Sequence, residues 1–507
     1  MLLRRNIIAN YVSSAYVAGV SILTVPLYVR HMGTEAFGLI GFYTLLQAWF
    51  QLLDAGLSTT LARESSRYSG GVGDASTFLR LRLVLERIFF AIGVCGVLAF
   101  FFFADAITFR WLQVGELSST EVINSVQLMG VIIACRWISC LYRGVITGFE
   151  QQVWLGSFNV WAATARFLFC LPVIIFVDAS PTMYFSYQAF ISLLESLMLY
   201  WKANKLFPKG AIVSGSAGSI RTPLNFATGV AFTSIVWVLV TQVDKMLLSK
   251  LLPLSAFGEF SLAVLLAGGI NLLAAPIGAA LLPRLTNTAA ADDENSTREL
   301  YKRYTQVTCL AMFPAAFTMY TCAVPVLIAW TGNETLARST GTVLGLYSLG
   351  NAIMGVVAFA YYIQYAKGNI RLHLIGNAVM AAIYLPFVFW VTHTHGTVGA
   401  AVAWLAMNAI YLAVWVPLVH RVIVPGLHLK WMLRDVLPVS TGAAIPTILF
   451  ALFTPGTLES MGRWSGALVA FTFFLVSLAG AAAGSSILRT RVRSLIRNRL
   501  SATPLHR

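Results

Sequence analysis

The chain of 507 residues is 58% hydrophobic and only 11% charged, with a mean hydropathy of +0.76 and a net charge of +15. A soluble domain is about half apolar and about a quarter charged, and it could not bury this much apolar surface. The composition therefore excludes a water-soluble fold and predicts an all-α integral membrane protein. The basic excess does not indicate nucleic-acid binding, because the charges lie in the gaps between apolar runs.

The N-terminal stretch MLLRRNIIANYVSSAYVAGVSILTVPLYVR starts like a signal peptide, with basic residues before an apolar run. Its apolar part is too long for a signal peptide and no small-residue cleavage site closes it, so it predicts a retained first span. The six cysteines all fall in apolar stretches without a CxxC pair, which is typical of buried free thiols. The sequence HTHG (393–396) is typical of a solvated turn, and no metal site is expected.

A helix needs about 20 apolar residues to cross the hydrocarbon core. On this basis the chain has about 14 predicted transmembrane helices. They lie near residues 7–29, 38–58, 83–103, 122–142, 154–177, 183–201, 224–249, 257–281, 304–330, 342–364, 372–392, 398–419, 436–453 and 465–487. The connections are short, so no segment could form a soluble catalytic domain.

The positions of Lys and Arg predict the orientation, because cytoplasmic loops are enriched in them. With the N-terminus in the cytoplasm, 27 of the 35 basic residues fall in inner segments and five in outer segments. The other three, Arg136, Arg166 and Lys245, lie within spans. A missed or additional span would place all later Lys and Arg residues on the opposite side of the membrane and remove this asymmetry. We therefore expect an even number of spans and cytoplasmic N- and C-termini.

An internal repeat is predicted by AFGLIGFYTLL (36–46) and AFGEFSLAVLL (256–266), which lie 220 residues apart. At the same offset, Arg30 corresponds to Lys250. Leucine matches are common in membrane helices, so coincidence is the alternative interpretation. Parallel repeats in transporters relate by an axis along the membrane normal and hold substrate at their interface.

The predicted domains are two parallel six-helix lobes around a central cavity, a linker and two C-terminal helices with a basic cytoplasmic tail. They span residues 1–203 and 224–420 for the lobes, 204–223 for the cytoplasmic linker, and 421–507 for the appended helices and tail.

Two charged residues are expected near the bilayer midplane. Arg166 and Glu195 each lie about twelve residues into their spans, at about 1.5 Å per residue. A charge at this depth is costly unless it contacts water or a partner. One interpretation is a structural ion pair between sequential antiparallel helices. The other places Arg166 on a cavity wall as a cationic handle for substrate, with Glu195 modulating it.

Three further charges raise the same question nearer the membrane surfaces. Arg136 either lines a cavity or extends to the inner interface. Asp244 and Lys245 lie about 8 Å from the outer end of their span, at about 1.5 Å per residue. Adjacent helical residues point about 100° apart, so we expect these two not to pair with each other directly. Lys245 shares a face with Thr241 and Trp237, which suits a polar cavity wall; outer-interface anchoring is the alternative.

The stretches PLYVRHMGTEAFGLIGFYTLLQAWFQLLDAGLSTTLARE (26–64) and VDKMLLSKLLPLSAFGEFSLA (243–263) resemble bacterial polysaccharide-biosynthesis flippases. These O-antigen-type oligosaccharide flippases belong to the multidrug/oligosaccharidyl-lipid/polysaccharide exporter superfamily. Asp54 and Gly56 match the family's D-x-G, which we interpret as helix-end structure. Asp244 matches an acidic position that the family has in the second stretch.

The resemblance implies translocation of an undecaprenyl-pyrophosphate-linked oligosaccharide from the cytoplasmic to the outer face of the bacterial inner membrane by alternating access. It implies a cationic cavity, for which Arg166, Arg136 and Lys245 are the candidate substrate-binding residues. Asp244 and Glu195 are the candidates for proton or sodium coupling or for charge balance. No GxxxxGK[ST] loop is present, so we expect neither ATP hydrolysis nor a cofactor. A glycan polymerase as partner is left open.

Two other functions compete with this interpretation. A multidrug/cation antiporter of the same fold would carry uncompensated carboxylates, whereas the basic residues within these spans at least balance the acids. A membrane glycan polymerase typically presents a large outer loop with catalytic groups, and the longest outer segment here, about 104–121, is too short. We therefore expect a transporter rather than an enzyme.

Overall fold

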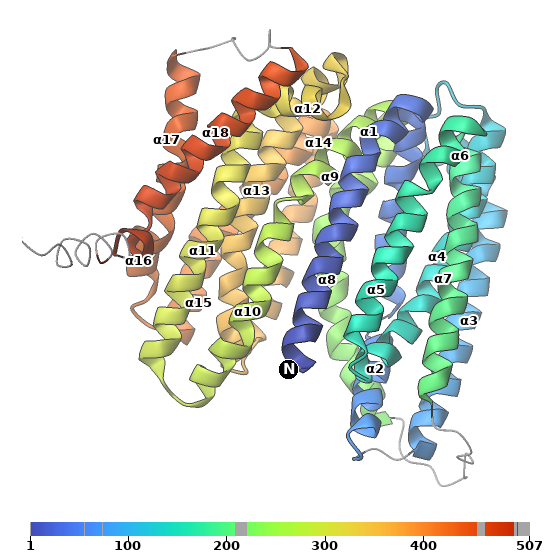
Figure 1. The fold of residues 1–507 in the computed structure, drawn as a ribbon, viewed down its shortest axis with the longest axis horizontal. Helices are drawn as coiled ribbons and strands as arrows, with labels where there is room; N and C mark the ends of the chain where they lie inside the picture. The colour runs from blue at the N-terminus through green and yellow to red at the C-terminus, as the bar shows by residue number, and fades with distance from the viewer. Residues whose placement is uncertain are drawn as a thin grey trace, which may run out of the picture. The chain divides into compact units, whose positions relative to one another are not determined.

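The fold is entirely helical over the residues that the structure, a computed structural model, describes: 2–54, 56–72, 75–207, 221–453, 462–490 and 494. No β-strand occurs among these residues. By length and composition, eight helical segments of the described chain could cross a membrane. The number rises to nine if Glu294–Thr321 and Ala323–Thr331, bent by 86°, form one span. The predicted all-α membrane fold is therefore confirmed (Figure 1).

The chain divides into two compact units, Met1–Ser261 and Leu262–Arg507. The predicted lobes are divided instead at the linker 204–223. Residues 208–220 of that linker lie outside the described residues. The division of the chain into lobes at this linker therefore stays a prediction.

The first unit is built from helices that run back and forth, several of them ending in a short π- or 3₁₀-helical turn. They are α1 (Leu2–Phe50), η1 (Gln51–Asp54), α2 (Leu57–Ser69), α3 (Ala75–Ala106), η2 (Ile107–Trp111), α4 (Ser119–Gly148), α5 (Gln152–Ala163), η3 (Thr164–Leu168), α6 (Cys170–Phe176), α7 (Pro181–Leu206) and α8 (Arg221–Leu251). Helix α9 (Leu254–Gly268) begins in this unit and ends in the second.

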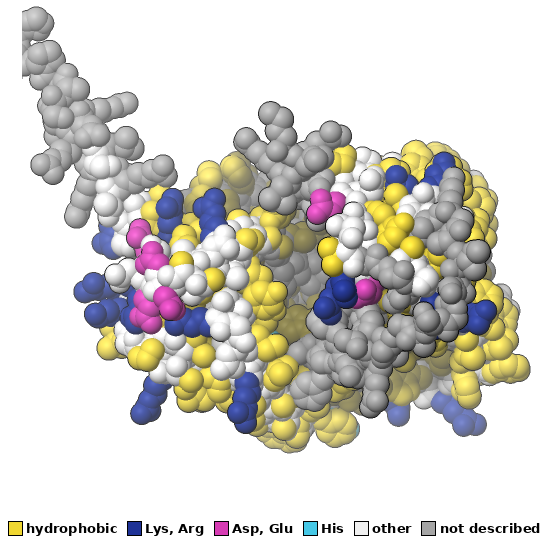
Figure 2. All heavy atoms as spheres, turned by 90° about the horizontal axis from the view of Figure 1, so that it is seen from below, with side chains coloured by type: hydrophobic (Ala, Val, Ile, Leu, Met, Phe, Trp, Pro, Cys, Tyr) yellow, Lys and Arg dark blue, Asp and Glu magenta, His cyan; other side chains and the backbone are white. Residues whose placement is uncertain are grey.

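The second unit contains the remaining helices. They are α10 (Asn271–Ala290), α11 (Glu294–Thr321), α12 (Ala323–Thr331), α13 (Glu334–Ala366), α14 (Arg371–Ile410), η4 (Tyr411–Trp415), α15 (Val416–Ile423), α16 (His428–Trp431), η5 (Met432–Val436), α17 (Leu437–Phe453) and α18 (Arg463–Gly484). Figure 2 shows Lys and Arg side chains, in dark blue, gathered with acidic side chains on one end of this unit. From the predicted orientation, we expect the end of the unit that is rich in Lys and Arg to lie in the cytoplasm.

Two helices each contain a pair of predicted spans that meet at a single glycine. Gly33 in α1 has φ 86° and Gly396 in α14 has φ 58°. Glycine adopts positive φ at little cost, so the chain changes direction without a loop. The loop expected at residues 30–37 is therefore wrong. Divided at these glycines, the described helices are consistent with the number of predicted spans.

Helix α4 occupies the middle of the first unit and packs against α2, α3 and α7. It begins with a capping box, in which Ser118 accepts from the Glu121 N–H and the Glu121 carboxylate accepts from the Ser118 N–H. Its Trp137 ring stacks on Phe89 at 4.3 Å and donates to the Phe89 carbonyl at 3.0 Å. Lipid is as apolar as these side chains, so close packing rather than burial from water holds the helix in place. The polar residues of α4 are therefore firmly positioned.

Candidate functional site

Arg166 and Glu195 form a bidentate ion pair that joins η3 to α7. The Arg166 Nε and Nη2 groups donate to the two carboxylate oxygens of Glu195. Only 18% of the Arg166 side chain and 3% of the Glu195 side chain are exposed. These side chains meet as the antiparallel spans predicted. A role for either in substrate binding or ion coupling stays a prediction.

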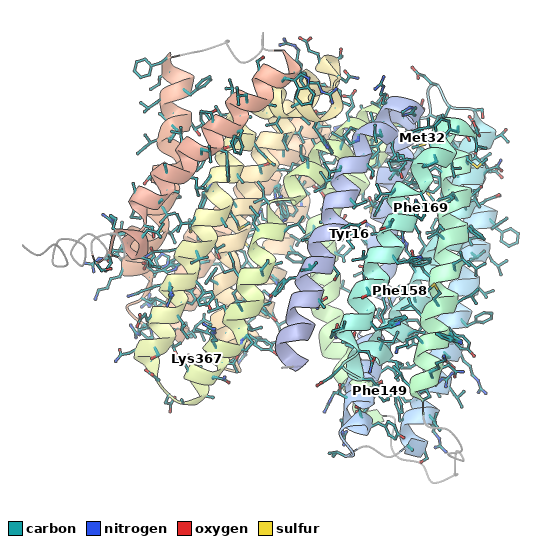
Figure 3. The ribbon with its side chains drawn as sticks, viewed as in Figure 1. Tyr16, Met32, Phe149, Phe158, Phe169 and Lys367 are labelled. Carbon is teal, nitrogen blue, oxygen red and sulfur yellow. The ribbon has the colours of Figure 1, made fainter. Side chains whose placement is uncertain are left out.

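The π-helical turn η3 places Arg166 in this position. Pro172 follows the turn and has no N–H, so one carbonyl at the end of the turn lacks its usual helical donor, and carbonyl groups along the turn accept from other donors. Side chains of α1 and α7 supply them: Tyr187 donates to the Ala165 carbonyl, Gln188 to Arg166 and Tyr28 to Phe167, at 2.8, 2.8 and 2.6 Å. Tyr16 on α1 adds a hydrogen bond to Thr164 at 2.8 Å (Figure 3). Arg166 therefore lies on a turn whose carbonyl groups are bonded by side chains of two neighbouring helices.

Arg136 on α4 differs from Arg166 because it has no carboxylate partner among the described residues. Its Nη1 donates to the Gln47 side-chain carbonyl at 2.8 Å. Its Nε is buried and has no hydrogen-bond acceptor in the described part of the chain. The Tyr43 ring lies 5.4 Å from its guanidinium carbon, close enough for a cation–π contact. Arg136 therefore keeps an uncompensated positive charge.

This guanidinium lines a pocket of about 290 Å³ within the first unit. The lining residues are Gln47, Phe50, Gln51, Leu52, Asp54, Ile133, Arg136, Trp137, Cys140, Trp237 and Val238. The one carboxylate among them, Asp54, accepts from the Ser58 N–H at 2.9 Å and the Ser58 hydroxyl at 2.5 Å. Asp54 thus stabilises the start of α2, in agreement with the predicted helix-end role. The pocket can offer a cation, amides and an indole to an anionic ligand.

Lys245 and Asp244 pair with each other, and the expectation that they would not was wrong. The Lys245 Nζ lies 3.5 Å from Asp244 Oδ1 and donates to the Thr241 carbonyl at 2.5 Å. The Asp244 side chain is 1% exposed and also accepts from the Lys245 N–H at 2.8 Å. The Cβ directions diverge by about 100°, but a lysine side chain is long enough to fold back. The contact with Thr241 agrees with the predicted shared face.

Arg143 is a candidate that the sequence analysis missed. It lies on α4 seven residues after Arg136, so the two side chains share a helix face. Its Nη1 donates to Asn159 at 2.6 Å, and its guanidinium carbon lies 5.4 Å from the Phe158 ring (Figure 3). The predicted span ended at residue 142, which assigned Arg143 to a loop, whereas α4 continues to Gly148. The seven-residue spacing was the signal that could have revealed it.

Gln47 was also missed, although a glutamine within an apolar span is itself a signal. It holds the Arg136 guanidinium from α1 and lines the same pocket. Among the predicted site residues, therefore, Arg136 lies unpaired in a pocket, whereas Arg166 pairs with Glu195 and Lys245 pairs with Asp244.

Comparison of folds defines the class of protein. The fold matches the lipid II flippase MurJ in an inward closed conformation with a TM-score of 0.71, over 93% of this chain and 98% of that one, at 13% identity. It matches an inward-facing multidrug resistance MATE family transporter of the MOP superfamily with a TM-score of 0.65, over 80% and 96%, at 12% identity. The protein therefore has the fold of a multi-pass membrane transporter of this superfamily.

The family follows from sequence. The model of a family described as polysaccharide biosynthesis protein matches residues 3–289, and the chain belongs to that family. It is also similar to a putative O-antigen transporter of Shigella flexneri, 19% identical over 441 residues that cover 85% of this chain and 98% of the relative. The predicted resemblance is thereby confirmed. Because the relatives are transporters and flippases, the family supports the prediction that the chain is not an enzyme.

Proposed function

We propose that the protein flips an undecaprenyl-pyrophosphate-linked oligosaccharide from the cytoplasmic to the outer face of the bacterial inner membrane by alternating access. The observation that carries this proposal is the uncompensated Arg136 guanidinium in its pocket. Family membership and the similarity to an O-antigen transporter support the substrate class.

A pyrophosphate suits this pocket electrostatically. Keeping a charged arginine away from water without a counter-ion is costly, so an anion that occupies the pocket lowers that cost. Phosphate oxygens match the planar fork of guanidinium donors, and among the described residues only the Gln47 side chain accepts from the Arg136 guanidinium. Arg143 on the same face of α4 would extend the positive strip toward the predicted cytoplasmic end. The prenyl chain would remain in lipid, because its transfer to a polar pocket would be unfavourable.

A multidrug/cation antiporter is the competing function, and the fold alone does not separate the two because a MATE transporter shares it. The charges favour the glycolipid. Glu195 is neutralised by Arg166, and Asp54, which accepts from Ser58, shares the pocket lining with the positive Arg136, so the pocket presents no excess of negative charge to a cationic drug. The pocket would therefore not favour a cation over an anion.

Energy for transport would come from a proton or sodium gradient or from removal of the product on the outer face. Asp244 and Glu195 remain the candidate coupling groups. Glu195 could take part only if the Arg166 pair opened during the cycle, because its carboxylate is otherwise neutralised. A glycan polymerase that consumes the product would be the natural partner.

The test is the sidedness of lipid-linked oligosaccharide in a host that lacks the protein. Loss of the protein should trap the glycolipid on the cytoplasmic face, Arg136→Ala should fail to restore export, and Arg136→Lys should restore part of it. Arg338→Ala is the matched control, since that arginine pairs with Glu334 at an exposed position. Outer-face accumulation of unpolymerised units would indicate a polymerase, and drug sensitivity alone a pump. Full export by Arg136→Ala at equal membrane abundance would overturn the role of this pocket.

A further inference from the structure

A second polar pocket lies in the second unit and takes no part in the proposed transport site. Its volume is about 400 Å³, and it is formed by α11, η5, α17 and the segment that follows α18. Its polar lining consists of Lys302, Arg434, Asp435, Ser486 and Arg489. The predicted orientation puts this end of the unit in the cytoplasm, at the level of lipid headgroups.

Positive charge predominates in this pocket. Neither Lys302 nor Arg434 forms an ion pair with a carboxylate of the described residues. Within the described residues, the Arg489 side chain makes only a long hydrogen bond, 3.4 Å, to the Gly484 carbonyl. The one carboxylate, Asp435, is 5% exposed and accepts from the Gln306 amide at 2.5 Å. Three cations therefore share the pocket with one carboxylate, and its lining carries a net positive charge.

The wall of the pocket is preorganised by Gln306. Its amide also donates to Ser486 at 2.7 Å, and its carbonyl accepts from the Ser485 hydroxyl at 2.8 Å and from the Ile487 N–H at 3.3 Å. One buried glutamine on α11 thus fixes η5 and the end of α18 relative to each other. A ligand entering the pocket would find its donors already ordered, which lowers the entropic cost of binding.

An apolar strip leads away from the pocket along η5 and α17. Leu433, which lines the pocket, is 54% exposed, and exposed apolar residues follow at helical spacing. They are Leu437, Ile445, Ile448 and Leu452, with exposed fractions of 40%, 53%, 55% and 69%. A cationic pocket at one end of a lipid-facing strip matches a molecule that has an anionic head and acyl chains.

We propose that this pocket binds the phosphate headgroup of an anionic phospholipid of the bilayer, such as cardiolipin or phosphatidylglycerol. Lys302, Arg434 and Arg489 contact the phosphate, the Ser486 hydroxyl donates to it, and the acyl chains lie along the strip that begins at Leu433. Basic pockets between helices on the cytoplasmic side of a membrane have this chemistry. The proposal is independent of the transported substrate.

The test is a titration of the purified full-length protein, in neutral detergent, followed by native mass spectrometry. The probes are cardiolipin, phosphatidylglycerol, phosphatidylcholine and inorganic phosphate. We expect the two anionic lipids to bind and phosphatidylcholine not to. The triple variant Lys302→Gln, Arg434→Gln, Arg489→Gln should bind anionic lipid about tenfold more weakly or worse.

The matched control is Arg303→Gln, Arg371→Gln, Arg421→Gln, which removes the same charge from exposed positions of the same unit. It should keep the binding of the unmodified protein. Equal losses in both triple variants, unchanged binding in the first, or competition by inorganic phosphate as strong as that by lipid would each overturn the proposal. If the first variant does not fold, Arg489→Gln alone serves, since this residue is exposed, and it should still weaken binding severalfold.

Discussion

Gly258 on α9 packs directly against Gly38 on α1. A methyl group added to Gly258 would lie 2.8 Å from the Gly38 nitrogen, 3.2 Å from its Cα and 2.1 Å from the Thr34 carbonyl oxygen. One added to Gly38 would lie 2.2 Å from the Leu254 carbonyl oxygen. No side chain fits between these backbones.

The contact is symmetric in sequence. Gly38 and Gly258 correspond in the predicted repeat, and Thr34 and Leu254 are separated by the same 220 residues. Gly258 lies against the Thr34 carbonyl, and Gly38 lies against the Leu254 carbonyl at the equivalent position. Gly41 and Ser261 also correspond and also meet, because a methyl group on Gly41 would lie 2.4 Å from the Ser261 hydroxyl oxygen. Equivalent positions meet in this way across a two-fold axis. This pattern favours the internal repeat over coincidence.

The first prediction concerns this contact. Gly258→Leu should separate α1 from α9, since overfilling a tight contact costs about 1–3 kcal/mol and the obstructing atoms are backbone. If alternating access requires the closed contact, export of lipid-linked glycan should be lost while the protein still inserts. Export in a deletion host and membrane abundance by immunoblot are the measurements.

Gly268→Leu is the matched control on the same helix, because a methyl group there would meet nothing within 4 Å. It should retain export. Normal export by Gly258→Leu would mean that the two helices need not approach this closely during transport.

The second prediction concerns the Arg166–Glu195 pair. Arg166→Ala leaves a carboxylate that is 3% exposed without its partner, and breaking a buried pair in this way costs about 3–5 kcal/mol. The variant should therefore lose stability, seen as a lower thermal unfolding midpoint in detergent and as less monodisperse protein. The unfolding midpoint of Arg166→Lys should lie between those of Arg166→Ala and the unmodified protein, because lysine keeps the charge but not the bidentate geometry.

The double variant Arg166→Leu, Glu195→Leu separates a structural role from a transport role. Replacing both members of a buried pair by apolar residues is often close to neutral for stability. We expect its unfolding midpoint to recover most of the loss. Export by this double variant would make the pair purely structural, whereas folded but inactive protein would place it in the transport cycle.

Much of the fold follows from hydropathy and from the Lys and Arg asymmetry, because a span must be apolar over a fixed length. The sequence does not reveal where connections shorten to one residue, as at Gly33, since any glycine near a span end could do the same. Span ends are equally hard to predict: Arg143 looks like a boundary, yet α4 continues past it, and Asn159 accepts a hydrogen bond from its guanidinium.

The site was less predictable because it depends on helix rotation and side-chain reach. Arg136, Arg166 and Lys245 all lie within apolar runs, and hydropathy treats them alike. Only tertiary contacts distinguish them: two have carboxylate partners, and Arg136 has a pocket instead. The error over Asp244 arose because the directions of Cβ atoms do not limit a side chain as long as lysine.

The third prediction uses the Gln47–Arg136 hydrogen bond. Gln47→Leu removes the only hydrogen bond that the described residues give the Arg136 side chain. A hydrogen bond to a charged group contributes about 1.5–3 kcal/mol. Without it the guanidinium is held less firmly in the pocket, so export should fall without being abolished. Gln47→Glu should impair export more strongly, since a carboxylate at this place would neutralise the guanidinium.

Equal export by Gln47→Leu and Gln47→Glu would contradict an electrostatic role of Arg136. The readout is the ratio of exported to cytoplasmic-face glycolipid. Gln51→Glu, which adds the same charge elsewhere on the pocket lining, is the matched control for the position of the carboxylate.

The last prediction concerns His428, which lies in the segment of the chain between the predicted spans 398–419 and 436–453. Its Nδ1 is 3.1 Å from His420 Nδ1, while His420 Nε2 contacts the Tyr301 hydroxyl at 2.7 Å. Burial lowers the pKa of His428 below its ordinary value of 6.5. The folded state thus favours the neutral ring, so its contribution to stability is complete above that pH and is lost as the pH falls. The unfolding midpoint should decrease between about pH 7.5 and about pH 5.5, and His428→Gln should make this decrease smaller, whereas His393→Gln should not. An unchanged slope in His428→Gln would assign the pH dependence to other groups.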